Sequence, residues 1–267
     1  PSPTGYLHRG HAFSALTAHE AARAEDGRFI LRIEDIDLSR SRPEYEAAIF
    51  EDLAWLGLTW EQPVRRQSEH FADYEAALER LRERGLLYRC FRTRKELAEM
   101  QSAPHGPAEA FRGGPLHPNE EERFLAEGKA YAWRLSLEAA RARLGNWSGL
   151  TFEDAAHGVV RAKPELAGDV VLARKDVGVA YHLAVVVDDA LQQITEVIRG
   201  EDLFEATHIQ RLLQALLELP TPRYRHHRLL TGPDGKRFAK RDKSETLRAI
   251  RERGTTPAQL RAELGFT

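Results

Sequence analysis

Two histidines and a glycine stand close together near the beginning of the sequence. His8 and His11 are three positions apart, and Gly10 lies between them. At the start of a helix this spacing places both imidazoles on one side, where free backbone N–H groups and the helix dipole attract phosphate. Gly10 has no side chain, so a nucleotide can approach the backbone. The pattern predicts a phosphate site, with two surface histidines near a turn as the alternative.

A cluster of cations lies near the other end of the sequence. Lys236, Arg237, Lys240 and Arg241 follow Gly235 within a turn-rich segment. Clustered cations on a loop can clamp the oxygens of a triphosphate. A basic segment is more often a solvated surface. Its position at the far end of an α/β domain from the histidines favours the functional interpretation.

Charged and aromatic side chains follow several predicted strands. Glu34 comes directly after an apolar run, and Tyr181 and Arg199 are expected at the ends of later strands. Ligands of open α/β sheets bind at the carboxyl ends of strands. A carboxylate there can hold an ammonium group, and an arginine can grip a carboxylate with two hydrogen bonds. An acidic amino acid is therefore a candidate substrate, and a structural ion pair is the alternative.

The elements that must position these side chains can be read from apolar periodicity and from helix-ending residues. We predict helices at residues 11–26, 43–56, 70–84 and 205–218, and two short helices within 245–265. We predict strands at residues 28–33, 86–91, 131–137, 169–173, 181–187 and 194–198. The alternation of strand and helix indicates an α/β fold with a parallel sheet. Residues 92–180 break this rhythm and are interpreted as an insertion.

The composition is that of an ordinary globular protein. The chain has 267 residues, 42% of them hydrophobic, and a formal net charge of −2. It can bury a core, and disorder is not expected. The net charge does not indicate a class of partner. The chain has arginine-rich stretches at residues 80–84 and 223–228, which are more typical of a solvated surface than of a surface that binds nucleic acid. No apolar run approaches the ~20 residues that span a membrane.

Cys90 is the single cysteine of the chain. No disulfide can form within the chain, which favours a reducing compartment. Because no signal peptide is recognised, we expect the protein in the cytoplasm. A lone cysteine also argues against a zinc site built from thiolates.

Taken together, the segments PSPTGYLHRGH, FILRIEDID, YHLAVVVDDA and ITEVIRGEDL and the basic segment after Gly235 resemble the glutamate-activating branch of the class I aminoacyl-tRNA synthetases. They occur in the family's order and cover most of the chain. The resemblance implies a Rossmann-type catalytic domain with an inserted α+β subdomain and a short C-terminal helical segment. It also implies ATP, with Mg²⁺, as a substrate.

The resemblance assigns roles to individual residues of this sequence. The positions that match the family's glutamate-binding residues are Pro1, Ser2, Glu34, Tyr181 and Arg199. The positions that match its ATP-binding residues are His8, Gly10, His11 and Lys240, and of these His8, His11 and Lys240 are the expected catalytic residues. The basic segment departs from the family's KMSKS motif at Arg237, Phe238, Ala239 and Arg241.

Within this branch the chain is similar to the short glutamyl-queuosine tRNA(Asp) synthetase family. The resemblance implies that glutamate is activated without tRNA and is then transferred to queuosine at the wobble position of tRNA(Asp). Only a short helical segment follows the basic segment, so no anticodon-binding domain is expected. We also expect a strand with a further glutamate-binding arginine to precede Pro1. A monomer is expected.

The family's zinc site is the feature that this sequence lacks. Cys90 matches the first of its cysteines, whereas Arg92 stands at the second position, and no cysteine follows Phe111. His105 and His117 are the nearest other candidate ligands. We expect no bound zinc and interpret Cys90 as a small buried apolar residue.

The expected organisation has four parts. Residues 1–91 and 181–222 form the two halves of the Rossmann domain, residues 92–180 form the insertion, and residues 223–267 hold the basic loop and a helical stem. Three alternatives to the queuosine-tRNA ligase stay open. They are a catalytic fragment of an ordinary glutamyl-tRNA synthetase, a noncatalytic paralogue that binds tRNA or protein, and a general nucleotidyltransferase.

Overall fold

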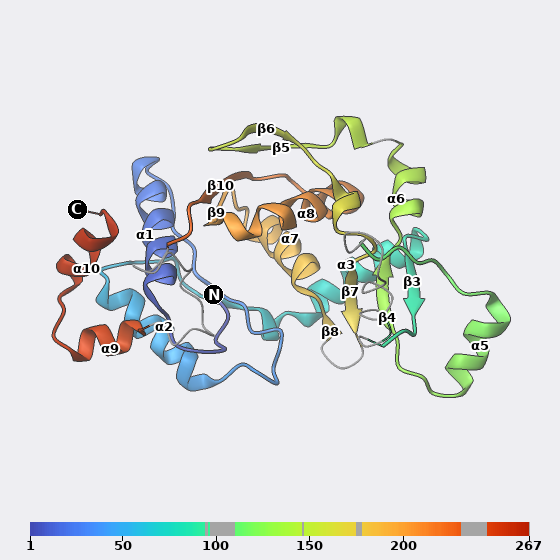
Figure 1. Cartoon of the computed structure of the whole chain (residues 1–267), viewed down its shortest axis with the longest axis horizontal. Coiled ribbons are helices and arrows are strands. Elements are labelled where there is room, and N and C mark those ends of the chain that lie inside the picture. Colours follow the sequence, from blue (N-terminus) through green and yellow to red (C-terminus); the bar gives the residue numbers. More distant parts are fainter. Residues whose placement is uncertain (94–95, 97–109, 146, 175–177, 231–244, 267) are drawn as a thin grey trace, which may run out of the picture. The chain divides into compact units, whose positions relative to one another are not determined.

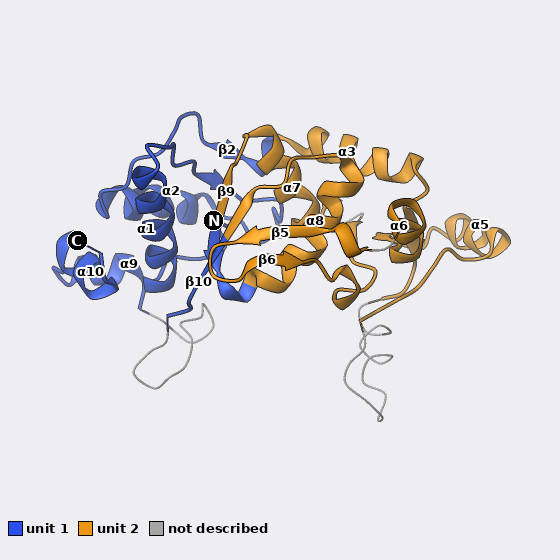
Figure 2. Cartoon of the chain, turned by 90° about the horizontal axis from the view of Figure 1, so that it is seen from above, with its two compact units in different colours: residues 1–69, 198–202, 225–267 blue, residues 70–197, 203–224 orange. Residues whose placement is uncertain are grey.

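The computed structural model describes residues 1–93, 96, 110–145, 147–174, 178–230 and 245–266 (Figure 1). The chain divides into two compact units, coloured separately in Figure 2. Unit 1 comprises residues 1–69, 198–202 and 225–267, and unit 2 comprises residues 70–197 and 203–224. The domain boundaries expected at residues 91, 180 and 222 stay a prediction.

Unit 1 is built mainly from helices around one short pair of strands. Its elements are α1 (Arg9–Ala24), β1 (Arg32–Ile33), α2 (Pro43–Trp55), β2 (Arg65–Arg66), the 3-10 turn η1 (Gln67–Glu69), α9 (Leu247–Glu252) and α10 (Pro257–Leu264). The helices predicted at 11–26 and 43–56 and the two short C-terminal helices are confirmed. The strand predicted at 28–33 is present only in its last two residues, which pair in parallel with β2.

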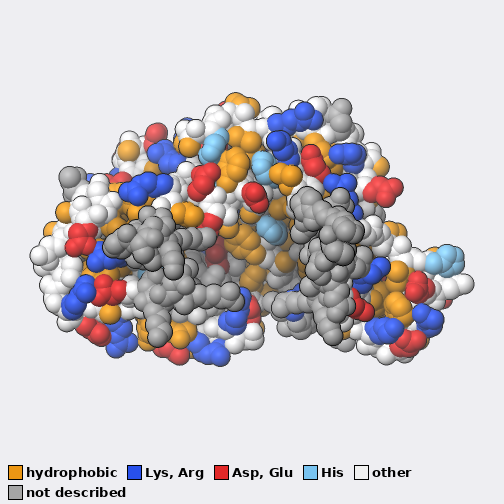
Figure 3. Space-filling model, viewed as in Figure 1, with side chains coloured by type: hydrophobic (Ala, Val, Ile, Leu, Met, Phe, Trp, Pro, Cys, Tyr) orange, Lys and Arg blue, Asp and Glu red, His pale blue; other side chains and the backbone are white. Residues whose placement is uncertain are grey.

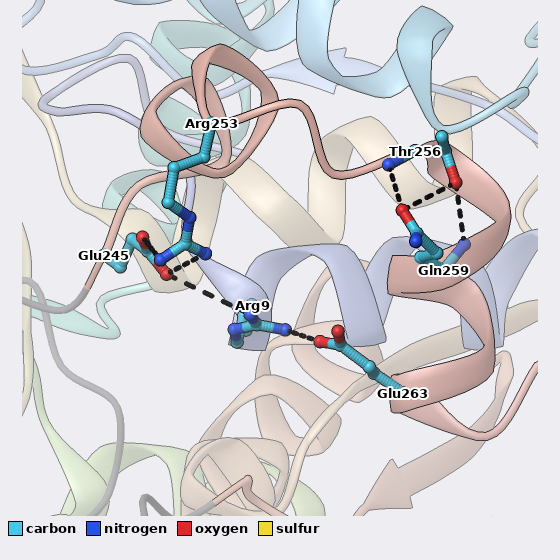
Figure 4. Close-up of polar contacts among 6 residues, drawn as sticks. All are labelled: Arg9, Glu245, Arg253, Thr256, Gln259 and Glu263. Atoms are coloured by element: carbon cyan, nitrogen blue, oxygen red, sulfur yellow. Dashed lines mark hydrogen bonds and ion pairs between the residues drawn. The ribbon is translucent and has the colours of Figure 1, made fainter.

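The ends of the unit 1 helices follow from local sequence. In α2, Pro43 occupies the first turn and Glu44 and Glu46 favour the positive end of the helix dipole. In α10, the Thr256 side chain accepts the Gln259 N–H while the Gln259 side chain accepts the Thr256 N–H, a reciprocal cap drawn in Figure 4. Both helices therefore begin where the sequence dictates.

One hydrophobic core holds unit 1 together. Leu7, Leu16, Ile33 and Ile49 are nearly or fully buried within it. The C-terminal helices complete the same core with the side chains of Leu247, Ile250, Leu260 and Leu264. Burial of each such side chain contributes roughly 1.5–3 kcal/mol. The C-terminal segment is consequently part of the core that supports α1.

Unit 2 contains an antiparallel sheet and three helices that pack together. Its first elements are α3 (Phe71–Glu83), β3 (Leu87–Cys90), α5 (Pro118–Ala126), β4 (Ala132–Leu135), α6 (Leu137–Leu144), the turn η2 (Trp147–Gly149), β5 (Thr151–Asp154) and β6 (Gly158–Arg161). They are followed by the turn η3 (Pro164–Leu166), β7 (Val171–Arg174), β8 (Gly178–Val179), α7 (Tyr181–Leu191) and α8 (Phe204–Leu217). The chain passes between the units after residue 69 and at three later points. These later points lie in strand β9 (Glu196–Gly200), in the turn η4 (Glu201–Leu203) and in strand β10 (Arg223–His227).

The strands pair in both senses. β1 with β2 and β5 with β10 are parallel, and the second pair belongs to a sheet of order β6-β5-β10-β9. β3 was expected in a parallel sheet, but it lies at the edge of the antiparallel sheet β3-β4-β7-β8. Its partner β4 comes more than 40 residues later in the chain, so nothing in the local alternation of strand and helix indicated this pairing.

The strand predicted at residues 181–187 is wrong, because this segment forms helix α7. Every residue from Leu183 to Asp189 is buried, so no polar face reveals a helical period. The three consecutive valines favour a strand locally. Packing against α3 and α8 outweighs that preference, and buried Tyr74 of α3 donates its hydroxyl to the Asp188 carboxylate at 2.9 Å.

Two arginines of the stretch 80–84 have a structural role. Arg80 donates to the Leu217 carbonyl at 2.9 Å, and Arg84 donates to the Leu216 carbonyl and pairs with Glu218 at 2.9 Å. These contacts satisfy carbonyls at the C-terminus of α8 and place cations at the negative end of its dipole. The interpretation as a solvated helix surface therefore holds only for Arg82, which pairs with Glu79 of its own helix.

Charged side chains of both signs are interspersed on the face shown in Figure 3. Within the described part of the chain, no helix has the length and apolarity needed to cross a membrane.

A buried carboxylate lies between α2 and α9. Asp52 has no exposed surface, and neither of its oxygens has a hydrogen-bond partner among the described residues. The Arg251 guanidinium is 3.6 Å away and also pairs with Glu51 at 2.9 Å. Burial raises the pKa of the Asp52 carboxyl to about 6, against the opposing attraction of Arg251.

The raised pKa predicts how stability depends on pH. Because the folded-state pKa exceeds the ordinary value, the stability contributed by this group is present below about pH 4 and is lost as the pH rises through about 6. Asp52→Asn cannot ionise. We expect its free energy of unfolding, relative to the parent, to increase by on the order of 2 kcal/mol from about pH 4 to about pH 7.5. Urea unfolding at both pH values measures this difference, and a difference independent of pH would contradict it.

Candidate active site

Helix α1 begins at a histidine that caps it. His8 has the extended backbone of an N-cap residue and is only 8% exposed. Its Nδ1 accepts the Gly10 N–H at 3.1 Å, and the Nδ1 of His11 accepts the His8 N–H at 3.1 Å. The two rings lie 3.8 Å apart between centroids. The predicted pair of imidazoles is therefore assembled at a helix N-terminus.

These hydrogen bonds determine where each imidazole carries its proton. In both His8 and His11 the Nδ1 atom accepts a backbone N–H, so a neutral ring must be protonated at Nε2. Each ring consequently keeps an N–H donor at the end of a helix whose dipole already favours anions. Such donors can bind phosphate oxygens without any change of protonation.

Gly10 is required by the conformation of His8. A Cβ atom built at position 10 would lie 3.0 Å from Cε1 and 3.1 Å from Nδ1 of the His8 ring. Such distances are tighter than ordinary van der Waals contact, so any larger residue would displace the ring. The absence of a side chain at position 10 thus leaves space for the His8 ring in its observed position.

The segment before α1 is tied to the end of strand β1. The Glu34 N–H donates to the Pro1 carbonyl at 2.9 Å, and the Arg42 N–H donates to the Pro3 carbonyl at 3.0 Å. The Thr4 N–H closes a turn onto the Ser2 carbonyl at 2.9 Å. Pro1 and Glu34, two of the predicted glutamate-binding residues, are thus neighbours.

The acidic residues after β1 have different surroundings. Glu34 is partly exposed and lies 3.9 Å from the Arg32 guanidinium. Asp35 is buried, and its carboxylate accepts the backbone N–H of Ser68 at 2.9 Å and the Ser68 hydroxyl at 2.5 Å. Asp35 therefore connects the end of β1 to the turn that follows β2.

Asp37 is engaged by its own turn. Its carboxylate accepts the Ser39 hydroxyl and the Arg40 Nε–H, each at 2.6 Å. These hydrogen bonds, the one from Ser39 first, lower the pKa of Asp37. Of the three acids in the segment FILRIEDID, Glu34 is the one whose carboxylate holds no turn together.

Arg199 lies at the end of β9, as predicted. It is 9% exposed, and its Nε donates to Nε2 of His226 on β10 at 3.2 Å. At the next residue, Gly200, a Cβ would lie 2.4 Å from the Asp202 carboxylate and 2.9 Å from the Leu229 side chain, so a larger residue would displace one or both side chains.

An ion-pair network holds the first residue of α1 (Figure 4). Arg9 pairs with Glu263 of α10 and lies 3.9 Å from Glu245, which also pairs with Arg253 at 2.6 Å. Main-chain contacts act at the same place, since the Leu247 N–H donates to the Leu7 carbonyl at 2.8 Å. The C-terminal helices therefore brace the start of the helix that carries the histidines.

The residues on both sides of segment 231–244 contact α1 or the chain just before it. Thr246, beyond the segment, forms an antiparallel bridge with His8. His227, before it, lies 3.0 Å from the Ser14 hydroxyl through Nε2, and Arg228 lies over the Phe13 ring at 5.1 Å. Lys240 itself lies outside the described residues.

The structure places most of the predicted site residues within one unit. Unit 1 contains Pro1, Ser2, His8, Gly10, His11, Glu34 and Arg199. Tyr181 belongs to unit 2, where it is the first residue of helix α7 and not, as predicted, the end of a strand. The part of the chain that the structure describes contains no group of three or more His, Cys, Asp or Glu side chains placed to hold a metal ion.

Cys90 is buried at the end of β3. The exposed Arg92 nearby carries a cation where the resembling family has a thiolate, so the described residues do not fit a zinc site. The absence of zinc stays a prediction, and His105 lies outside the described residues.

Several residues at the site were missed from the sequence. His226 and Ser68 act through side chains, and Glu245 and Glu263 act on Arg9 from the far end of the chain. They contact residues distant in sequence, which no local pattern can indicate.

The class of protein is an α/β enzyme domain, in which unit 1 holds two imidazoles at the start of α1 and charged residues at the ends of β1 and β9. More specifically, the chain belongs to the tRNA synthetases class I (E and Q) catalytic-domain family, whose model matches residues 1–266. The predicted α/β fold class and the family resemblance are confirmed.

The comparisons with individual proteins agree. The chain is 46% identical to the glutamyl-Q tRNA(Asp) synthetase of Rhodobacter capsulatus, over 100% of this chain and 98% of that protein. It is 41% identical to the protein of that name from Symbiobacterium thermophilum, over 100% of this chain and 84% of the relative. A crystal structure of a glutamate tRNA ligase from Elizabethkingia meningosepticum, in complex with its amino acid, superposes with a TM-score of 0.80 at 28% identity. That match covers 96% of this chain and 57% of the ligase, so the chain spans little more than half of the solved protein.

The two functions of His8 can be separated by substitution. His8→Ala removes both the helix cap and the Nε2 donor, so we expect a stability loss of about 1 kcal/mol and a fall in adenylation rate of about 10²-fold. His8→Asn keeps a cap acceptor but not the imidazole. We expect it to retain stability and to lose the same activity. Thermal unfolding and single-turnover rates measure the two effects, and an Asn variant with the parent rate would contradict the role of the ring.

Proposed function

We propose that this protein uses ATP to activate L-glutamate and transfers the glutamyl group to queuosine at the wobble position of tRNA(Asp). The observation that supports the activation step is the pair of imidazole donors at the start of α1. The names of the two relatives that match the full chain support the choice of tRNA.

The proposed reaction has two steps. In the first, an oxygen of the glutamate α-carboxylate attacks the α-phosphorus of ATP, and the bond to the bridging oxygen of the β-phosphate breaks. Glutamyl-adenylate forms and pyrophosphate leaves. In the second step a hydroxyl of queuosine attacks the glutamyl carbonyl, loses its proton, and releases AMP. The ester product and AMP account for every atom of the mixed anhydride and the hydroxyl.

In the first step the protein is proposed to stabilise the negative charge that develops on the α-phosphate. We assign the Nε2–H groups of His8 and His11 to phosphate oxygens, because the Nδ1 atom of each ring accepts a backbone N–H. We assign Lys240 to the same triphosphate on the strength of the family motif. Mg²⁺ enters with ATP as part of the substrate, held chiefly by the phosphates.

Recognition of glutamate is assigned to residues at the strand ends. Glu34 would hold the substrate ammonium group, and Arg199 would hold a carboxylate. By resemblance to the family, Pro1, Ser2 and Tyr181 are assigned as further glutamate-binding residues. We further propose that the protein works as a monomer without zinc, in the cytoplasm, where its tRNA and ATP substrates are found.

The roles of Glu34 and Arg199 predict a selective loss of glutamate binding. Each of Glu34→Gln and Arg199→Ala leaves a charged group of the substrate without its partner, which costs about 2–5 kcal/mol. We expect a matching rise in KM for glutamate in ATP–pyrophosphate exchange, with KM for ATP little changed. Asp37→Asn is the matched control, because that carboxylate already serves its own turn. Equal rises in both KM values would contradict the assignment.

The choice of tRNA is tested by transfer of labelled glutamate. With ATP present, we expect label on queuosine-containing tRNA(Asp) and none on tRNA(Glu), and glutamate-dependent pyrophosphate exchange without any tRNA. Label on tRNA(Glu) would instead support the second candidate, a catalytic portion of an ordinary glutamate tRNA ligase, which the likeness to the solved ligase favours. No label and no exchange would indicate a noncatalytic paralogue.

A further inference from the structure

Arg199 and His226 form a buried pair across neighbouring strands. β9 and β10 are adjacent in their sheet, and the two side chains belong to residues that are 9% and 4% exposed. The Arg199 Nε and the His226 Nε2 are 3.2 Å apart. Hydrogen bonds to charged groups are among the stronger contacts in a protein interior.

The direction of this hydrogen bond is determined by chemistry. A guanidinium group has five N–H donors and no acceptor, so the Nε2 atom of His226 must accept. The imidazole is therefore neutral, with its proton on Nδ1. A doubly protonated ring would place its Nε2–H donor against the Arg199 Nε–H donor and could not make this contact.

The same contact limits how Arg199 can hold a ligand. A guanidinium can bind a carboxylate through its two Nη groups, or side-on through Nε and one Nη. Because the Arg199 Nε–H already donates to His226, it is not available for the side-on mode. A carboxylate would therefore bind end-on, through the two Nη groups.

The geometry points to His226 as a positioning residue that orients Arg199 for end-on recognition of the glutamate carboxylate. This inference rests on the proposed function, in which glutamate is the ligand of Arg199. It concerns a residue that touches the arginine and not the substrate. The adjacent His227 has a different environment, since its Nε2 lies beside the Ser14 hydroxyl of α1.

The test compares two replacements of His226 in ATP–pyrophosphate exchange without tRNA. His226→Leu leaves the buried Arg199 Nε–H without its acceptor, and we expect KM for glutamate to rise about tenfold to a hundredfold. KM for ATP should stay within about twofold of the parent. His226→Gln places an amide oxygen near the position of Nε2 and should restore KM for glutamate to within about threefold of the parent.

His19→Leu is the matched control. It also replaces a buried imidazole of unit 1, three turns along α1 from His8, and we expect both KM values to match the parent. A His226→Leu enzyme with the parent KM for glutamate would overturn the positioning role, as would a Gln variant no better than the Leu variant. If the parent itself shows no exchange, the proposed function fails, and this role for His226 fails with it.

A second measurement does not depend on the folding of the Leu variant. Nitrogen-15 NMR of the histidine side chains in the parent protein, assigned by comparison with His226→Gln, reports which ring nitrogen carries the proton. We expect a neutral His226 protonated at Nδ1 and not at Nε2. A ring protonated at Nε2 could not accept from Arg199 and would overturn the inference whatever the kinetic result.

Discussion

The hydrogen bond from the Gly10 N–H to Nδ1 of His8 is the contact on which the candidate active site depends. It caps α1, and by occupying Nδ1 it leaves the ring proton on Nε2. His11 repeats this arrangement with the His8 N–H. A structural requirement of every helix, the satisfaction of its first N–H groups, is thus met by the same atoms that determine which ring nitrogen carries the proton.

The C-terminal helices give this helix start its rigidity. Arg9 is held by Glu245 and Glu263, and Glu20, farther along α1, pairs with Arg261 at 2.8 Å. α10 is therefore attached to α1 at two points by charge, and its leucines enter the same core. Partly exposed ion pairs contribute little stability individually. Their value here is geometric, because several of them act on one helix whose first turn must be held accurately.

Several polar side chains near the strand ends hold the surrounding structure in place. The carboxylates of Asp35 and Asp37 accept hydrogen bonds within turns. The His226 Nε2 atom accepts a hydrogen bond from Arg199. Supporting contacts of this kind preorganise a site, so that less free energy is used in ordering it when the substrate binds. Glu34 and Arg199, one anion and one cation, match the two charges of an amino acid.

Local signals were sufficient for much of the fold. The helices at α1, α2 and α3 were predicted because their apolar periodicity and end signals lie within the helices themselves. The same reasoning failed at α7, where burial on all sides removes the polar face that would have shown a helical period. It failed again at β3, because strand pairing depends on a segment far along the chain.

For the site, the sequence by itself determined the chemistry that is available. His8, Gly10 and His11 stand within one helical turn, so their cooperation is a local matter and needed no knowledge of the fold. Only the tertiary structure decided which nitrogen of each imidazole bears the proton, and that His226 holds Arg199. The physical reason is that the protonated nitrogen of a ring and the partner of an arginine both depend on which atoms face each other in the folded chain. For Arg199 and His226 the atoms are brought together by strands 27 positions apart, whose adjacency follows from the packing of the whole sheet.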